Sequence, residues 1–100
     1  MNHQIYRVTD FAIVAPYTLR VSFDDDTQQV INFEPVLYGE LYLPLRDLVV
    51  FNQVRLDPEV HTLTWLNGAD FDPATLHDWP SLAQQLSERA QHWQAQLQAA

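Results

Sequence analysis

Alternating apolar and polar side chains in the first third of the chain predict a β-hairpin. Residues 18–23 (TLRVSF) and residues 28–33 (QQVINF) each alternate with the period of two that is typical of a strand with one buried face. The DDDT segment between them, residues 24–27, is a cluster of turn-forming residues. The side chains expected on the buried face are Leu19, Val21, Phe23, Ile31 and Phe33.

A second alternation predicts another hairpin, with residues 53–57 (QVRLD) and residues 61–66 (HTLTWL) as its two arms. In the second arm, the alternation sets His61, Leu63 and Trp65 against Thr62, Thr64 and Leu66. Two shorter β-rich pieces, residues 5–8 and 11–15, precede the first hairpin.

Helical spacing between the hairpins predicts a short central helix. Leu45, Leu48, Val49 and Phe51 have the required spacing, and Pro44 could begin the helix because a proline is well tolerated in the first turn.

The segment from Ser81 onward predicts a C-terminal amphipathic helix, because apolar residues recur every three to four positions among Gln and Ala. Pro80 fits its first turn. The apolar stripe consists of Leu82, Leu86, Arg89 or Ala90, Trp93 and Leu97. This stripe is larger than a terminal helix on a small sheet needs for solubility. Leu82, Leu86, Trp93 and Leu97 are therefore a candidate interface.

Together these elements predict an α+β fold, with small antiparallel β-hairpins, a short central helix and a C-terminal helix. The 100 residues are enough for one domain with a modest core. We divide the chain into an α+β domain at residues 1–79 and a C-terminal helix at residues 80–100. That helix is expected to pack on the same domain or on a partner.

Charge and cysteine content exclude several classes of function. Thirteen acidic residues stand against five Arg and no Lys, which gives a net charge of −8. The Arg residues are scattered, so a direct nucleic-acid role is disfavoured. The chain has no Cys, which removes disulfides and thiolate sites. No signal peptide and no apolar run of about 20 residues is found. We therefore expect a cytoplasmic protein that does not bind membranes.

The segment WLNGADFDPATL, residues 65–76, most resembles a functional site. A cation loop of the EF-hand type is disfavoured, because the glycine position and the closing glutamate do not fit. A turn followed by a helix cap explains more residues: Asn67-Gly68 supplies a positive-φ pair, and Asp72 caps a helix that begins at Pro73. Asp70 and Asp72 remain a weaker ligand or catalytic pair, which would require a pocket that both share.

The remaining chemical patterns are weak. His3, His61, His77 and His92 lack the spacing of a zinc site, and the three carboxylates of residues 24–26 are expected to point in different directions into water. No phosphate-binding loop, dinucleotide motif or nucleophile elbow is present, and the chain has only two Gly. We expect no metal, no cofactor and no catalytic residue.

Several motifs resemble the small bacterial domain-of-unknown-function family DUF2442. These motifs are W-x-N-G-A-D-F-D-P-x-x-L at residues 65–76, V-S-F-D-D at 21–25, L-R-D at 45–47 and F-N-Q-V-R-L-D at 51–57. The resemblance covers about residues 5–77. It implies an α+β fold of short antiparallel strands and brings no established activity. It also implies that some relatives carry a following helix-turn-helix, and that others are encoded beside a small partner protein in toxin–antitoxin-like arrangements.

The chain departs from this family in three respects. Asp26 stands where a hairpin Gly is expected, and Leu66 stands where Pro often precedes the Asn-Gly pair. The segment after Pro80 has room for only one helix, whereas a helix-turn-helix needs at least two. DNA binding by this chain is weakened accordingly.

These observations leave three hypotheses for the function. The leading one is a non-enzymatic protein-interaction domain that works as a homodimer or with a small protein partner. A competing one is an acid–base or metal-assisted enzyme that uses Asp70, Asp72 and a nearby His. The third is an acidic partner that neutralises a basic protein by charge complementarity. The sequence does not rank the first against the third.

Overall fold

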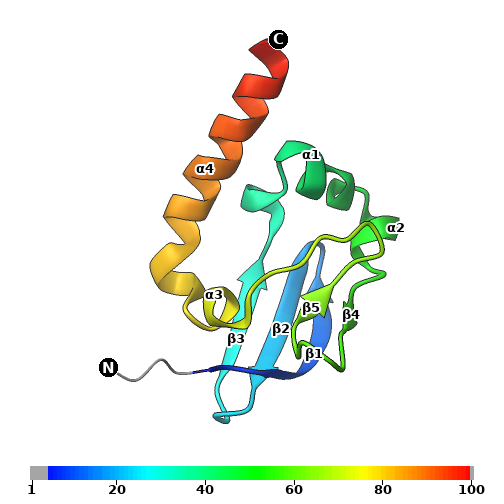
Figure 1. Cartoon of the computed structure of the whole chain (residues 1–100), viewed down its shortest axis with the longest axis vertical. Coiled ribbons are helices and arrows are strands. Elements are labelled where there is room, and N and C mark those ends of the chain that lie inside the picture. Colours follow the sequence, from blue (N-terminus) through cyan, green and yellow to red (C-terminus); the bar gives the residue numbers. More distant parts are fainter. Residues whose placement is uncertain (1–4, 100) are drawn as a thin grey trace.

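A three-stranded antiparallel sheet forms one layer of the molecule. The computed structural model describes residues 5–99, and it describes the side chains in that range except those of residues 93, 94 and 96–99. The strands are β1 (Val8–Ala15), β2 (Thr18–Phe23) and β3 (Gln28–Asn32), in the order β1-β2-β3 (Figure 1). The predicted first hairpin is therefore confirmed.

The register of the hairpin follows from its buried face. Leu19 lies opposite Ile31 in the β2–β3 ladder, and both side chains are fully buried. The region before the hairpin differs from the expectation, because one eight-residue strand, β1, replaces the two short pieces. Two register shifts, between Val8 and Asp10 and between Ile13 and Ala15, divide this strand. The alternation of residues 8–15 is interrupted because the strand is irregular: a β-bulge moves the side chains that follow it to the opposite face of the sheet.

The segment between the two hairpins forms four short helical turns. These are η1 (Glu34–Val36), α1 (Gly39–Tyr42), η2 (Leu43–Arg46) and α2 (Leu48–Phe51). The predicted central helix is divided at Asp47, whose backbone is extended and whose carboxylate accepts the Val49 N–H at 2.9 Å. Asp47 can cap α2 only by leaving the helical conformation, because a capping residue is extended.

The second hairpin is also present, but its strands are only two residues long: β4 (Arg55–Leu56) and β5 (Leu63–Thr64). The expected face assignment is wrong at its start. His61 is exposed with φ of 54°, and Thr62 is buried and donates its hydroxyl to the Phe71 carbonyl. Because the backbone of His61 is left-handed, His61 does not continue the alternation of β5, which lies after it.

The helices α3 (Pro73–His77) and α4 (Trp79–Ala99) complete the chain. α4 begins at Trp79, one residue before the expected range of 80–100, and Pro80 lies in its first turn as predicted. It packs on η1, α1 and α3, and its C-terminal part continues beyond them (Figure 1). Among the described residues, no helix has the length and apolar character needed to cross a membrane.

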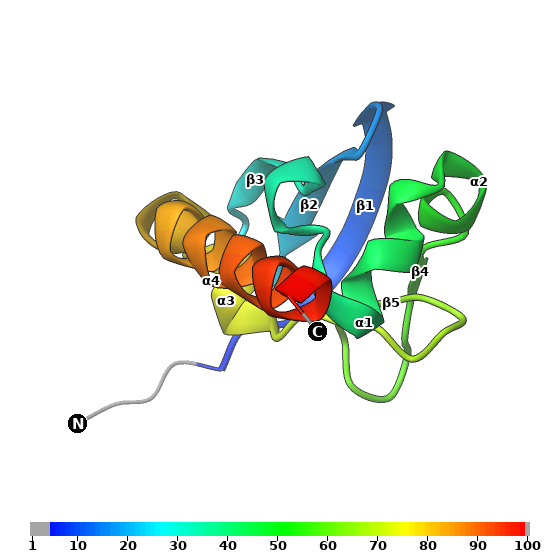
Figure 2. The same ribbon diagram turned by 90° about the horizontal axis from the view of Figure 1, so that it is seen from above.

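The core lies between the sheet and the helical segments, on one side of the sheet (Figure 2). Its centre is aromatic: the ring of Phe33 lies 5.2 Å from those of Phe71 and Trp79 and 6.2 Å from that of Trp65. The Trp65 indole N–H donates to the Phe51 carbonyl at 2.9 Å, so its polar atom is satisfied inside the core. The α+β fold class is confirmed.

Candidate functional site

The Asn67-Gly68 pair lies in a tight loop after β5. The Gly68 N–H donates to the Trp65 carbonyl at 3.0 Å, and the Trp65 N–H donates to the Ala69 carbonyl at 2.9 Å. Gly68 has φ of +88°, but Asn67 does not share this conformation. The expected pair of positive φ angles is therefore a single one. Such a loop, with a left-handed glycine just before the chain pairs again, is a common short hairpin connection.

Asn67 fixes the loop with both ends of its side chain. Its carbonyl oxygen accepts the Ala69 N–H at 3.1 Å, and its amide donates to the Leu41 carbonyl in α1 at 2.9 Å. The two bonds tie the loop to the helical segment, so Asn67 has a structural explanation that needs no ligand.

Asp72 stands immediately before α3, at the N-cap position, and Pro73 is the first helical residue. Its backbone is extended, as a cap requires, but its carboxylate accepts no capping hydrogen bond. Asp72 therefore occupies the N-cap position of α3 without the side-chain hydrogen bond that usually makes a cap stabilising.

Asp70 and Asp72 line one pocket of about 250 Å³ between α1, residues 70–75 and α4. The pocket also has Tyr42 and Arg89 in its wall, and its apolar lining consists of Val36, Phe71, Leu86 and Ala90. The Tyr42 hydroxyl donates to the Asp70 carbonyl at 2.9 Å. Burial, and secondarily the charge of Asp70, raise the pKa of Tyr42. The two carboxylates share a pocket, but both are exposed, whereas catalytic carboxylate pairs depend on desolvation.

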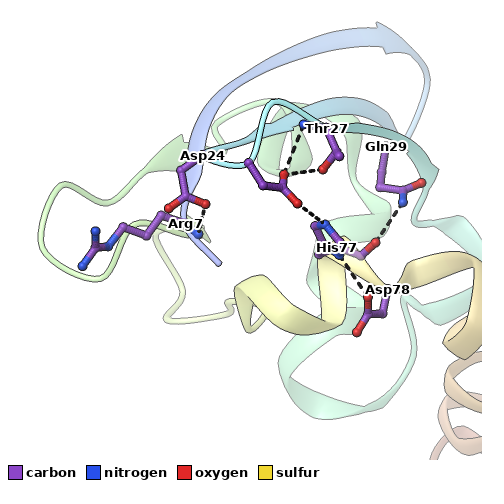
Figure 3. A network of polar contacts seen from close by, with 7 residues as sticks. Arg7, Asp24, Thr27, Gln29, His77 and Asp78 are labelled. Carbon is purple, nitrogen blue, oxygen red and sulfur yellow. Dashed lines mark hydrogen bonds and ion pairs between the residues drawn. The ribbon is translucent and has the colours of Figure 1, made fainter. Parts of the chain in front are cut away.

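A second polar cluster surrounds His77, at the end of α3, and it was not anticipated from the sequence. The His77 Nε2 lies 2.8 Å from the Asp25 carboxylate in the β2–β3 turn, and its Nδ1 lies 3.0 Å from the Asp78 carboxylate (Figure 3). The Tyr6 ring stacks on the imidazole with centroids 3.7 Å apart, and Phe23 meets it edge-on at 5.1 Å. Asp25 and His77 are 52 residues apart, so no local pattern could have paired them.

The electrostatics of this cluster favour a charged imidazole. Hydrogen bonds to Asp78 and then to Asp25 raise the pKa of His77, against the opposing effect of burial. The hydrogen bond from Thr27, and a smaller one from His77, lower the pKa of Asp25. Burial raises the pKa of Tyr6, and the charges of Asp78 and Asp25 add to this effect.

Because both ring nitrogens face carboxylates, both contacts are hydrogen bonds only when the imidazole is protonated, and that form has no free lone pair with which to act as a base. It is well suited to fasten two parts of the chain. Gln29 in β3 adds to the same connection by donating to the His77 carbonyl at 2.8 Å (Figure 3). The cluster therefore holds the β2–β3 turn against the junction of α3 and α4.

The remaining candidate ligands are spread over the molecule. Asp24 accepts the Arg7 backbone N–H at 3.1 Å, while Asp25 faces His77, so the carboxylates of the turn do not converge. His61 is exposed in the loop before β5, His92 is exposed on α4, and His3 lies outside the described residues. Within residues 5–99, no three His, Asp or Glu side chains are grouped as a metal site would require.

The candidate interface on α4 is only partly described. Leu82 and Leu86 are half-buried, Leu86 packs against the core, and Ala90 is 2% exposed. This part of the stripe contacts the chain's own domain. The side chains of Trp93 and Leu97 lie outside the described residues.

Five exposed apolar side chains lie elsewhere, on α1, η2, α2 and the loop after β5. We call this set of residues the apolar corner, and it consists of Leu41, Leu43, Leu48, Val49 and Leu66. Val49 and Leu66 are the most exposed of the five, at 70% and 66%. The bond from Asn67 to the Leu41 carbonyl holds the loop after β5 against α1.

Comparison with known proteins places the chain in a family. The profile described as "Protein of unknown function (DUF2442)" matches residues 8–80. No curated protein and no solved structure matches the chain significantly.

Proposed function

The chain belongs to the DUF2442 family of proteins of unknown function, and on this premise we propose that it is a non-enzymatic domain that binds another protein. The observation that carries the proposal is the apolar corner. Monomeric proteins rarely expose several large apolar side chains together, and such surfaces mark interaction sites more often than not. Five such side chains are exposed on α1, η2, α2 and the loop after β5, of which α1 and the loop are joined by the Asn67 bond.

The charge of the chain indicates what kind of partner this surface fits. Acidic residues adjoin two members of the apolar corner in the sequence: Glu40 precedes Leu41 and Asp47 precedes Leu48, and both acidic residues are exposed. The net charge of −8 steers a basic protein toward such a surface and repels nucleic acid. We propose a small basic protein as the partner, which agrees with the toxin–antitoxin-like or regulatory arrangement implied by the family resemblance.

Capture from the protein's own cells, at low and moderate salt, tests this proposal. The parent is compared with Val49→Asp in the apolar corner and with Val30→Asp, a matched control on β3 whose parent side chain is 66% exposed. We expect a basic protein that the parent and the control retain and that Val49→Asp loses. Equal retention by all three proteins would move the interaction away from the corner. A retained protein that is acidic would contradict the proposed partner class.

An acid–base or metal-assisted enzyme that uses Asp70 and Asp72 is the alternative function, and the pocket that both residues line is the observation in its favour. Calcium or magnesium that raised the melting temperature of the parent, but not that of Asp70→Asn, would support it, because a ligand stabilises only the state it binds. The exposure of both carboxylates makes this function the weaker of the two.

Homodimerisation through α4 also stays a proposal, as does the division into residues 1–79 and 80–100. Part of the predicted stripe is occupied within the domain, since Leu86 and Ala90 face the core cluster. A homodimer is therefore better sought on another surface.

A further inference from the structure

The two edges of the three-stranded sheet are protected differently. At the β3 edge, α3 packs beside the strand, and Gln29 bonds to the His77 carbonyl. At the β1 edge, β4 packs near the strand, and the Val8 N–H donates to the His61 carbonyl at 2.8 Å. Beyond that point, no described residue outside β2 forms a backbone hydrogen bond with residues 9–15. The C-terminal half of β1 stands clear of β4 and β5 in Figure 2.

The side chains of β1 do not protect this edge. Natural sheets keep edge strands from pairing by means of Lys, Pro or bulges. Residues 9–15 (TDFAIVA) contain one charge, Asp10, and no Pro or Lys. Ile13 and Val14 are 46% and 47% exposed. The register shifts lie at the two ends of the strand, so residues 10–13 remain regular and able to pair.

We propose that β1 pairs with β1 of a second copy of this chain, antiparallel about a two-fold axis perpendicular to the sheet and centred on Ala12. Such an axis keeps the inner faces of both sheets on one side, so each residue pairs with one on the same face. The two three-stranded sheets become one sheet of six strands. The pairing is independent of the apolar corner and of the partner proposed for it.

The strand is self-complementary in this register. Phe11 lies opposite the partner's Ile13, and by symmetry this aromatic–β-branched pair occurs twice. Ala12 lies opposite its own copy at the axis, where a small side chain avoids crowding. Asp10 does not face the partner's Asp10 in this register, so the only charge of the strand meets no like charge, and the regular pairing is that of residues 11–13. These pairs follow from the symmetry and from the alternation of β1.

The overall charge makes the pairing salt-dependent. Two chains that each carry −8 repel one another, and salt screens that repulsion over about 8 to 10 Å. We therefore expect the dimer to strengthen as salt is raised. A complex with a basic partner is expected to weaken instead, which separates the two interactions experimentally.

Cross-linking gives a direct test, because the chain has no Cys of its own. Ala12→Cys places two thiols across the axis, where directly opposed residues have Cβ atoms about 4.5 to 5.5 Å apart, close to what a disulfide spans. We expect a disulfide-linked dimer on mild oxidation of Ala12→Cys. Asp10→Cys and Val30→Cys serve as controls that should stay largely monomeric, and circular dichroism verifies their folding.

Sedimentation of the unmodified chain completes the test. The parent should dimerise at micromolar to high micromolar concentration, more strongly at high salt, and Ile13→Lys should shift it to monomer while Val30→Lys does not. A parent that stays monomeric throughout this range overturns the proposal. So does a dimer that Ile13→Lys leaves intact, or an Ala12→Cys protein that cross-links no better than Val30→Cys.

Discussion

Two hairpin loops in this molecule share one backbone geometry and are built from different residues. In each, the N–H of the first residue donates to the carbonyl of the fifth, between Phe23 and Thr27 at 2.9 Å and between Trp65 and Ala69 at 2.9 Å. The fourth residue has a left-handed φ, +68° at Asp26 and +88° at Gly68. A side-chain oxygen of the third residue accepts the N–H of the fifth at 3.1 Å in both loops.

The third and fourth positions distinguish the loops. Gly68 adopts the left-handed conformation freely, whereas Asp26 does so against a steric cost that Asp tolerates better than most residues. Asn67 uses its amide to bond α1, and Asp25 uses its charge to bond His77. The same turn can therefore be encoded in two ways, and the polar residue at its third position decides which distant segment it holds.

The largest effect is expected where the loop meets the core. Trp65, the first residue of its loop, is 2% exposed, so Trp65→Ala should reduce the free energy of unfolding by about 3 to 5 kcal/mol through the cavity it leaves. Trp65→Phe should cost less, because it keeps most of the apolar volume. It still loses the hydrogen bond to the Phe51 carbonyl. Chemical denaturation of both variants measures this. Equal losses would mean that the bond matters more than the packing.

A smaller loss is expected at the glycine of the same loop. Gly68→Val should destabilise the protein by about 1 to 3 kcal/mol, because a β-branched residue is strained at φ of +88°. A Cβ at this position meets nothing within 4 Å, so the strain arises from the backbone alone. Gly68→Asn, which tolerates this conformation, should cost less. An unchanged denaturation midpoint for Gly68→Val would show that the loop adopts another conformation.

A glycine at the left-handed position of the other loop, residues 23–27, should stabilise the protein. Asp26→Gly should stabilise the protein by less than about 1 kcal/mol, because relief of the left-handed strain exceeds the entropy that a glycine loses on folding. Asp24→Gly is the matched control, and it should bring no gain since Asp24 has an ordinary φ. A loss of stability in Asp26→Gly would mean that its carboxylate contributes more than its backbone conformation costs.

The smallest expected effect on stability concerns the ion pair between Asp25 and His77, which the loop of residues 23–27 forms and the loop of residues 65–69 lacks. The raised pKa of His77 contributes stability that is fully present below its unfolded value near 6.5 and is lost as pH rises through the folded value. The lowered pKa of Asp25 contributes stability that is present above its ordinary value of 3.8 and is lost as pH falls. The melting temperature of the parent should therefore exceed that of His77→Gln most between about pH 4 and 6.5.

His61→Asn is the control for this measurement, because Asn tolerates the left-handed φ of that exposed position. Its melting temperature should follow that of the parent across the pH range. A pH-independent difference between the parent and His77→Gln would show that the stacking of Tyr6 on the ring, and not its charge, is what the histidine provides.

Local patterns predicted the first hairpin in both extent and face, because an alternation of two is set by neighbours along the chain. They were less successful from residue 44 to residue 66. There a cap at Asp47 divided the expected helix, and a left-handed residue at His61 ended the expected alternation. Each change depends on the backbone conformation of one residue, and a periodicity that is averaged over several residues does not reveal it.

The sequence by itself determined the α+β class, the two hairpins, the C-terminal helix, the family and the acidic character that disfavours nucleic acid, because each depends on local periodicity, on motifs or on a sum of charges. Only the tertiary structure decided that Asp25 meets His77, that Asp70 and Asp72 share a pocket with Arg89, and that residues 9–15 of β1 form backbone hydrogen bonds with β2 alone among the described residues. These depend on contacts between segments distant in sequence, which packing of the whole core selects.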